Sequence, residues 1–257
     1  MLKSTYFMDM YYPSGKEELK AYCQAEQNNE HTPSLILLPH AGIEYVHRMY
    51  QEAFAYIHSP QRIVIIAPLH SEKLEKDRDS FLFTLSTGDV ETPLGPVTVQ
   101  AAEGIVVSDS YAEEEYTVEL FYPYVALNSP SSVIVPVFTA LETKEDIQAL
   151  SRLMVRLKKE VNDSVFIVSG NFTSTGTSQE VNQMARTLKE LLENNAPLLE
   201  AGSRKKISGC AYRILEAART AFPGKFSLMM ARSGDYLGES IKSDADGRIW
   251  QVYAIKE

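Results

Sequence analysis

The stretches that decide the fold are SLILLPH, from Ser34 to His40, and RIVIIAPLH, from Arg62 to His70. Each contains a run of Leu, Ile or Val residues, which is typical of a strand buried on both faces of a parallel sheet. Each then ends in a proline that is followed, directly or one residue later, by a histidine. Between the two stretches, residues 44–57 carry apolar side chains at helical spacing. This strand, helix, strand order predicts an α/β fold.

Similar patterns alternate along the rest of the chain. Apolar runs predict strands at 133–138, 165–169, 226–231 and 249–255, and helical spacing predicts helices at 15–27, 112–127, 144–160, 178–194 and 208–221. Residues 81–99, around the proline- and glycine-containing turn at 92–96, predict an inserted hairpin. No repeat, long linker or change of composition divides the sequence. We therefore expect a single α/β domain over residues 1–257, with a central mixed or largely parallel sheet flanked by helices.

The charge of the chain excludes some classes of partner. Its 257 residues include 34 Asp and Glu against 25 Lys and Arg, for a formal net charge of -9. Because this field repels phosphate backbones and anionic lipids, we expect neither a nucleic-acid nor a membrane partner. We interpret the acidic run Glu113-Glu114-Glu115 as a solvated helix N-terminus.

Cysteine content and hydropathy indicate the compartment. The two cysteines, Cys23 and Cys210, are too few and too far apart for a disulfide framework or a zinc knuckle. The longest apolar run, from Ile63 to Leu69, is far shorter than a bilayer span, and the first residues lack the pattern of a signal peptide. These features predict a cytoplasmic protein.

The two histidines that follow the strands carry the main chemical signal. If the strands are parallel neighbours, their carboxyl ends bring His40 and His70 to one edge of the sheet, where α/β folds bind ligands. Two imidazoles suit iron, zinc, copper or nickel when a carboxylate or a thiolate completes the set. The alternative is that each histidine only forms a hydrogen bond within its own loop.

The order of several short motifs is informative over nearly the whole chain. In sequence order they are Tyr11-Tyr12-Pro13, PHAGIEY from Pro39, APLH from Ala67, TPLG from Thr92, the segment from Glu115 to Tyr124, and Ser233-Gly234-Asp235. Together they resemble the Memo family, relatives of the class III extradiol ring-cleaving dioxygenases. The resemblance implies the α/β fold of those proteins, a metal- or ligand-binding cleft at the histidines, and association with a radical-SAM system.

The sequence departs from this family pattern where the family has acid–base groups. Tyr116 stands in place of a histidine, and Asn171 and Ser174 stand in place of the aspartate and histidine of S-x-D-F-x-H. An amide and a hydroxyl do not exchange protons near pH 7, and a tyrosine of ordinary pKa is a poor substitute. We therefore expect a cleft, lined in part by these residues, that binds a small molecule, a peptide or a metal but lacks dioxygenase catalysis. The alternative is a metal-dependent oxidoreductase or dioxygenase-like enzyme that uses iron or copper.

The sequence indicates the third metal ligand and the remaining cleft residues less strongly than it indicates the two histidines. We predict Asp235 as the ligand, because a carboxylate beside two histidines suits ferrous iron; alternatively it only stabilises its turn. We expect Tyr45 to line the cleft, and His47 to lie either near it or on a helix surface. We also place Cys210 among the cleft residues, but because it has no histidine near it in sequence we expect a buried, unreactive thiol rather than a nucleophile.

Overall fold

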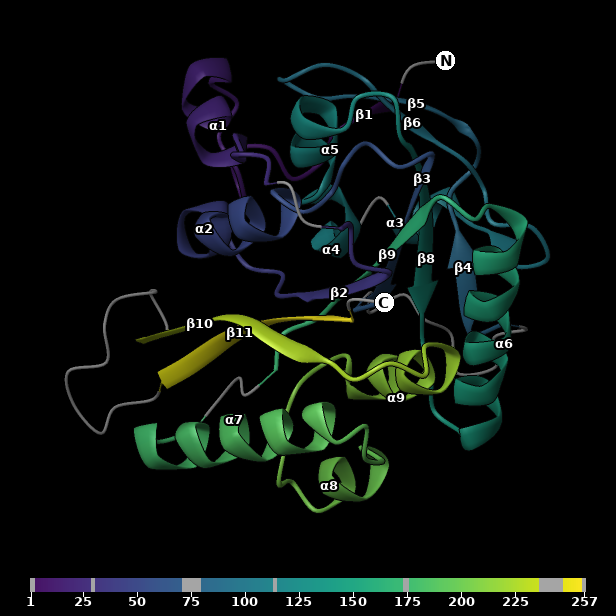
Figure 1. The fold of residues 1–257 in the computed structure, drawn as a ribbon. Coiled ribbons are helices and arrows are strands. Elements are labelled where there is room, and N and C mark those ends of the chain that lie inside the picture. Colours follow the sequence, from purple (N-terminus) through teal and green to yellow (C-terminus); the bar gives the residue numbers. More distant parts are fainter. Residues whose placement is uncertain are drawn as a thin grey trace.

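A mixed sheet of eleven strands runs through the protein, with helices on both of its faces (Figure 1). The computed structural model describes residues 3–28, 31–70, 80–112, 115–172, 176–235 and 247–255. The strands are β1 (Lys3–Ser4), β2 (Leu35–Leu38), β3 (Arg62–Pro68), β4 (Leu82–Thr84), β5 (Gly88–Glu91), β6 (Val97–Val99), β7 (Val106–Val107), β8 (Val133–Thr139), β9 (Ser164–Ser169), β10 (Ser227–Asp235) and β11 (Gly247–Ile255). They lie in the order β1-β5-β6-β8-β3-β9-β2-β11-β10, with β4 and β7 attached beside β8.

The centre of the sheet is parallel and its C-terminal edge is antiparallel. Strand β3 pairs in parallel with β8 and β9, and β9 pairs in parallel with β2. Strand β11 pairs antiparallel with β2 and β10. The predicted α/β fold with a mixed, largely parallel sheet is therefore confirmed.

Nine helices in the described residues cover the sheet. They are α1 (Lys16–Cys23), α2 (Ile43–Phe54), α3 (Asp109–Ala112), α4 (Tyr116–Glu119), α5 (Tyr122–Asn128), α6 (Lys144–Glu160), α7 (Ser178–Glu193), α8 (Leu199–Ser203) and α9 (Tyr212–Ala221). Figure 1 shows α1, α2 and α5 on one side of the sheet and α7, α8 and α9 on the other. None of these helices is both long and apolar enough to cross a membrane.

Alternation along the central strands explains why both faces are covered. In β2, Ile36 and Leu38 join the core beneath α2, whereas Leu35 and Leu37 join the core beneath α9. All four side chains are fully buried. Because burial of each such side chain stabilises the fold by about 1.5–3 kcal/mol, a strand apolar on both faces is stable only between two helical layers.

The helix predicted at 112–127 is instead three short helices. Between α3 and α4, Glu115 has an extended backbone with φ -120°, and its carboxylate caps α4 by accepting a hydrogen bond from the main-chain N–H of Thr117. Pro123 in the first turn of α5 fits a new helix start. Because of this interruption, Glu115 is not part of a continuous helix, and its side chain is enclosed in the protein.

We expect the central strands to contribute most to the free energy of unfolding. Two substitutions to alanine, one in a central strand and one in an exposed strand, test this. Ile65 of β3 is fully buried in the core, and we expect Ile65→Ala to lower the free energy of unfolding by about 2–5 kcal/mol. Val107, 51% exposed in β7, provides the control, and its change to alanine is expected to shift stability by less than about 0.5 kcal/mol. Urea unfolding followed by circular dichroism measures both, and equal losses would contradict this account of the core.

Candidate metal centre

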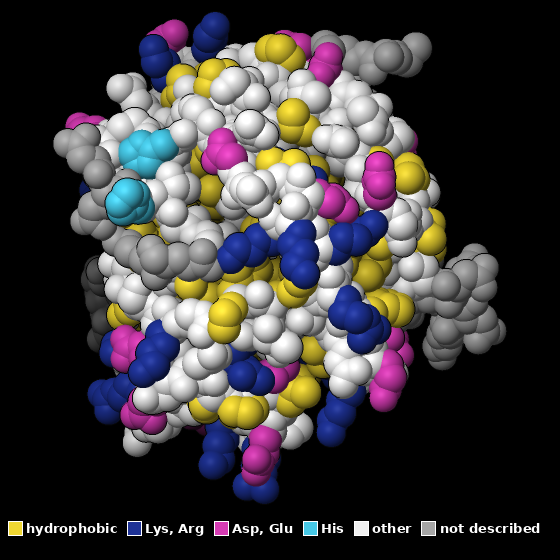
Figure 2. All heavy atoms as spheres, turned by 45° about the vertical axis from the view of Figure 1, so that its right-hand side comes forward, with side chains coloured by type: hydrophobic (Ala, Val, Ile, Leu, Met, Phe, Trp, Pro, Cys, Tyr) yellow, Lys and Arg dark blue, Asp and Glu magenta, His cyan; other side chains and the backbone are white. Residues whose placement is uncertain are grey.

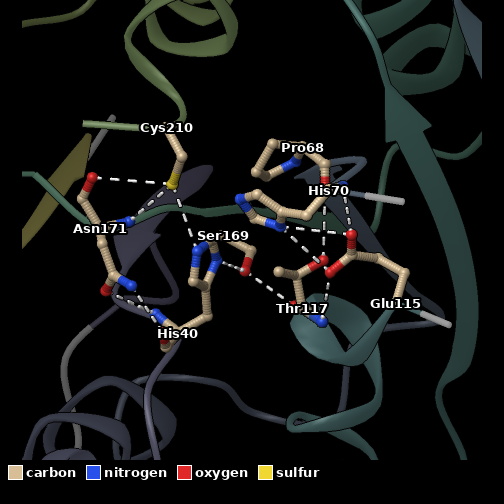
Figure 3. Close-up of polar contacts among 8 residues, drawn as sticks. All are labelled: His40, Pro68, His70, Glu115, Thr117, Ser169, Asn171 and Cys210. Carbon is tan, nitrogen blue, oxygen red and sulfur yellow. Dashed lines mark hydrogen bonds and ion pairs between the residues drawn. The ribbon is translucent and has the colours of Figure 1, made fainter. Parts of the chain in front are cut away.

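Three side chains with metal-ligating atoms meet at the carboxyl edge of the parallel strands: His40, His70 and Cys210 (Figure 3). Their ligand atoms all lie within 4.8 Å of one another. The two imidazole rings are close to perpendicular, with centroids 5.4 Å apart, and Nε2 of His40 is 3.2 Å from Sγ of Cys210. The histidine pair expected from the sequence thus forms, with a sulfur as its third member.

The strands that deliver the two histidines are not neighbours, contrary to the prediction. Strand β9 lies between β2 and β3. Its last residue, Ser169, is level with Leu38 of β2, and its small side chain leaves room for the imidazole of His40 beside it. The middle strand therefore contributes a hydrogen-bonding partner to the site.

Ser169 fixes the tautomer and orientation of His40. The Ser169 hydroxyl donates to the carbonyl oxygen of Thr117 at 2.8 Å and lies 2.9 Å from Nδ1 of His40. Because a hydroxyl has one hydrogen, it accepts from the histidine, and Nδ1 carries a proton. Nε2 of this buried ring is consequently the atom that faces the Cys210 sulfur.

Glu115 holds His70 in the corresponding way. Its carboxylate accepts from the main-chain N–H of His70 at 2.5 Å and lies 3.3 Å from Nδ1 of the ring. Hydrogen bonds to the Cys210 sulfur and to Glu115 raise the pKa of His70 to about 10, against the opposing effect of desolvation. Burial alone would raise the pKa of Glu115, but its hydrogen bonds and charge interaction with His70 lower it. The interpretation of Glu115 as a solvated residue is wrong, because its side chain is fully enclosed.

Cys210 differs most from its prediction. Its side chain is exposed, so the expectation of a buried thiol is wrong. Although no histidine lies near it in sequence, the fold places it beside His40 and His70. Desolvation by the residues around the sulfur would raise the pKa of the thiol, but the charge of His40 and hydrogen bonds from His40, His70 and the N–H of Asn171 lower it to about 6. Cys210 is therefore largely a thiolate at pH 7, and we expect it to be reactive.

Two glycines allow the loop that carries Cys210 to approach the strand end. The N–H of Cys210 donates to the carbonyl oxygen of Asn171 at 3.2 Å. Gly209 has φ +155°, and a Cβ there would lie 2.4 Å from that same oxygen. A Cβ at Gly170 would lie 2.3 Å from Cβ of Ala211. Because the loop occupies these residues, α9 begins at Tyr212 rather than at the predicted position 208.

Asn171 acts on the main chain of His40. Its Nδ2 donates to the His40 carbonyl oxygen at 2.7 Å, and its Oδ1 accepts from the His40 N–H at 3.2 Å. This pair of bonds positions His40 and engages both ends of the Asn171 side-chain amide. The main chain of Asn171 also bonds Cys210: its N–H donates to Sγ, and its carbonyl oxygen accepts from the Cys210 N–H. Ser174, the other residue predicted to stand in place of an acid–base group, lies outside the described residues.

Tyr116 lies beside both imidazoles. Its ring centroid is 5.7 Å from that of His40 and 6.2 Å from that of His70, and on its other side it stacks on Tyr11 at 4.1 Å. Burial, followed by the nearby Tyr11 and Glu115, raises the pKa of this phenol above its ordinary value. Tyr116 is thus a neutral wall of the site and a poor base.

The remaining predicted residues make other contacts or are not described. Tyr45 stacks on Trp250 of β11 with centroids 6.4 Å apart. His47 packs against Tyr22 of α1 and points Nδ1 toward its own helix, which is the helix-surface alternative. The main chain of Asp235 ends β10, but its side chain lies outside the described residues, so its role as a ligand stays a prediction.

A cleft of about 570 Å³ opens beside the cluster, within the usual size range for small-molecule sites. His70 and Cys210 form part of its wall. The strand-end residues Pro68 and Thr139 and the first turn of α9, with Tyr212 and Arg213, form other parts. A ligand in this cleft would therefore lie next to the His70 and Cys210 side chains.

These features define an α/β protein with a His-His-Cys cluster at the carboxyl edge of its parallel strands. A family model described as Memo-like protein matches residues 9–230, and the chain belongs to this family. It is 25% identical to a MEMO1 family protein of Aquifex aeolicus (strain VF5), over 71% of each chain. It is 26% identical to a MEMO1 family protein of Thermotoga petrophila, over 82% of this chain and 80% of the relative. The resemblance noted in the sequence is thereby confirmed.

Sequence reasoning missed Glu115 and Ser169 as parts of the site. Glu115 begins the segment that resembles the family, and this was the available signal; its position beside an acidic run favoured a surface interpretation instead. Ser169 is the last residue of a predicted strand, and the rule for strand ends could have indicated it.

The pKa of Cys210 gives a direct test in the metal-free protein. We expect its rate of alkylation by iodoacetamide to rise with the thiolate fraction, with a midpoint near pH 6. His40→Gln removes the largest charge that stabilises the thiolate, so the midpoint should move up toward the ordinary 9.0. Cys23, buried and with a raised pKa, serves as the internal control and should stay unlabelled in the native state. A wild-type midpoint at the ordinary thiol value would contradict the geometry of the pair.

Proposed function

We propose that this protein binds a transition metal ion through Nε2 of His40, Nε2 of His70 and Sγ of Cys210, and holds a small molecule beside it in the cleft. The observation that carries the proposal is the orientation of the two rings. Each has its Nδ1 directed to a fixed partner, Ser169 or Glu115, which leaves Nε2 for the sulfur side. Metal-binding histidines characteristically have such partners, because these fix the tautomer and the ring plane.

The spacing of the three atoms supports the fit of a metal. Ligands of a tetrahedral zinc ion, at about 2.0–2.3 Å from the metal, lie about 3.3–3.8 Å from one another. The present atoms all lie within 4.8 Å of each other, and Nε2 of His40 lies 3.2 Å from Sγ of Cys210. Small side-chain rotations therefore suffice to reach metal-binding geometry.

The donor set favours particular metals. Two imidazoles and a thiolate suit zinc and copper, whereas the set with Asp235 predicted from the sequence would suit ferrous iron. We therefore propose zinc or copper as the first candidates and iron as the third. When bound, such an ion would polarise a ligand atom in the cleft, and copper or iron would also exchange electrons with it.

The neighbouring side chains favour binding over ring cleavage. The amide of Asn171 is engaged by the His40 main chain, and Tyr116 stays a neutral phenol. Glu115 faces His70 and is enclosed, so it has no access to a ligand. None of these three groups supplies a free base near neutral pH, and a positioned base typically contributes about 10²–10⁴-fold in rate. We propose that the protein does not cleave catechol rings.

A metal-dependent oxidoreductase is the second candidate. The observation that favours it is the cleft, which reaches His70 and Cys210 and could place a reactant against an open coordination position. In this alternative the metal itself would carry the redox chemistry, and the side chains would bind and orient the reactant.

Metal analysis of protein purified anaerobically without chelator tests the proposal. We expect about one zinc, copper or iron ion per chain, lost in His40→Ala and in Cys210→Ser. Glu115→Gln removes the charge that orients His70, so it should weaken metal binding about 10–100-fold without abolishing it.

The control for the loss of that charge is Glu44→Gln, at an exposed carboxylate on α2. It should bind metal like the wild type. A wild-type protein that binds none of the three metals, or a Cys210→Ser variant that keeps full affinity, would contradict the proposed ligand set.

A further inference from the structure

Arg213 introduces a cation into the cleft beside the proposed metal centre. It lies in the first turn of α9, three residues after Cys210, and both residues line the same cleft. Its guanidinium is held in place: Nη1 donates to the carbonyl oxygen of Leu141 at 3.2 Å, and the group lies 5.3 Å from the ring centroid of Tyr212. A cation held in this way on a cleft wall loses little further freedom when it binds an anion.

Most of the hydrogen-bonding capacity of Arg213 is unused. A guanidinium has five N–H donors, and within the described part of the chain one of them bonds a protein acceptor. No carboxylate among those residues lies within ion-pair distance of it. Glu142 also lines the cleft, but it is exposed, so solvent screens its charge. The remaining N–H groups form a planar donor set that matches a carboxylate.

The other parts of the lining limit the ligand further. Pro68, Leu141 and Ile214 give the cleft an apolar stretch, which suits an aliphatic body. Although the chain has a net charge of -9, Lys and Arg side chains gather on the face that comes forward in Figure 2, where α6 lies. The negative net charge is therefore unevenly distributed over the surface.

We propose that the cleft binds a small aliphatic carboxylate, with the carboxylate on Arg213 and a metal-binding group at its other end directed to the His40, His70 and Cys210 centre. This inference rests on the proposed metal site and names the class of ligand that the site takes. The cation and the metal would act as two anchors at the ends of an apolar cleft. Molecules with only one of the two groups should bind more weakly.

Binding of thiol carboxylates to Co(II)-loaded protein tests the inference. The probes are mercaptoacetate, 3-mercaptopropionate and 4-mercaptobutyrate, each compared with its methyl ester, which keeps the thiol and removes the charge. The change in the thiolate-to-cobalt absorption band measures affinity. We expect at least one acid to bind the wild type about 10–100-fold more tightly than its ester, the range for hydrogen bonds to a charged group.

Three variants locate the effect. Arg213→Gln should bind acid and ester alike, whereas Arg213→Lys should keep only part of the preference for the acid, because an ammonium carries the charge without the planar donor set. Arg152→Gln, which removes an exposed cation on α6, should retain the full preference and so controls for net charge. If Arg213→Gln fails to fold, the comparison of acid and ester in the wild type still tests whether the cleft prefers a carboxylate, and the partial loss in Arg213→Lys tests the role of Arg213.

The outcomes separate this inference from the proposed function. Cobalt binding with equal affinity for acid and ester would overturn the carboxylate ligand and leave the metal site standing. A preference for the acid that persists in Arg213→Gln would overturn the role of Arg213. Failure of cobalt to bind would overturn the metal site, and this inference with it.

Discussion

The site depends on the pairing of β9 between β2 and β3. The parallel registers place Leu38 beside Ser169 and Ile66 beside Val168, so three chain segments leave the sheet at nearly the same level. His40, His70 and Asn171 follow within a few residues of these strand ends, and their positions are set by main-chain hydrogen bonds deep in the core. A shift of one residue in any of these strands would turn its buried side chains to the opposite face, so the fold strongly specifies the register.

The loop of Cys210 and the carboxylate of Glu115 complete the site from outside the parallel strands. Gly170 and Gly209 permit the close approach of the cysteine loop. Glu115, fully enclosed, depends on His70 as its charged partner. Loss of one member of a buried ion pair typically costs about 3–5 kcal/mol, although His70 is partly exposed and solvent reduces this figure here. Stability and the arrangement of the ligands are therefore coupled in this part of the protein.

The sequence predicted the layers and the histidine pair but not the whole cluster. Unbroken apolar runs such as Arg62–Pro68 require burial on both faces, which determines the α/β class, and prolines and histidines at strand ends indicate the site. Cys210 was not predictable from local pattern, because its contact with His40 spans 170 positions and depends on loop geometry at two glycines. Glu115 was misinterpreted because the sequence predicts one continuous helix over 112–127. The structure has three short helices there, and the break before α4 lets the Glu115 carboxylate point into the protein. Strand order was missed because the segment that forms β9 lies far downstream of β2 and β3.

In this Memo-like chain, the two strand-end histidines lie close to an asparagine whose amide holds the main chain of one of them. The amide of Asn171 therefore positions His40, as the proposed binding centre requires. X-ray absorption spectroscopy of the metal-loaded protein tests this account most directly. For zinc, we expect one sulfur at about 2.3 Å and two imidazole nitrogens at about 2.0–2.1 Å. A first shell of oxygen and nitrogen without sulfur would contradict it.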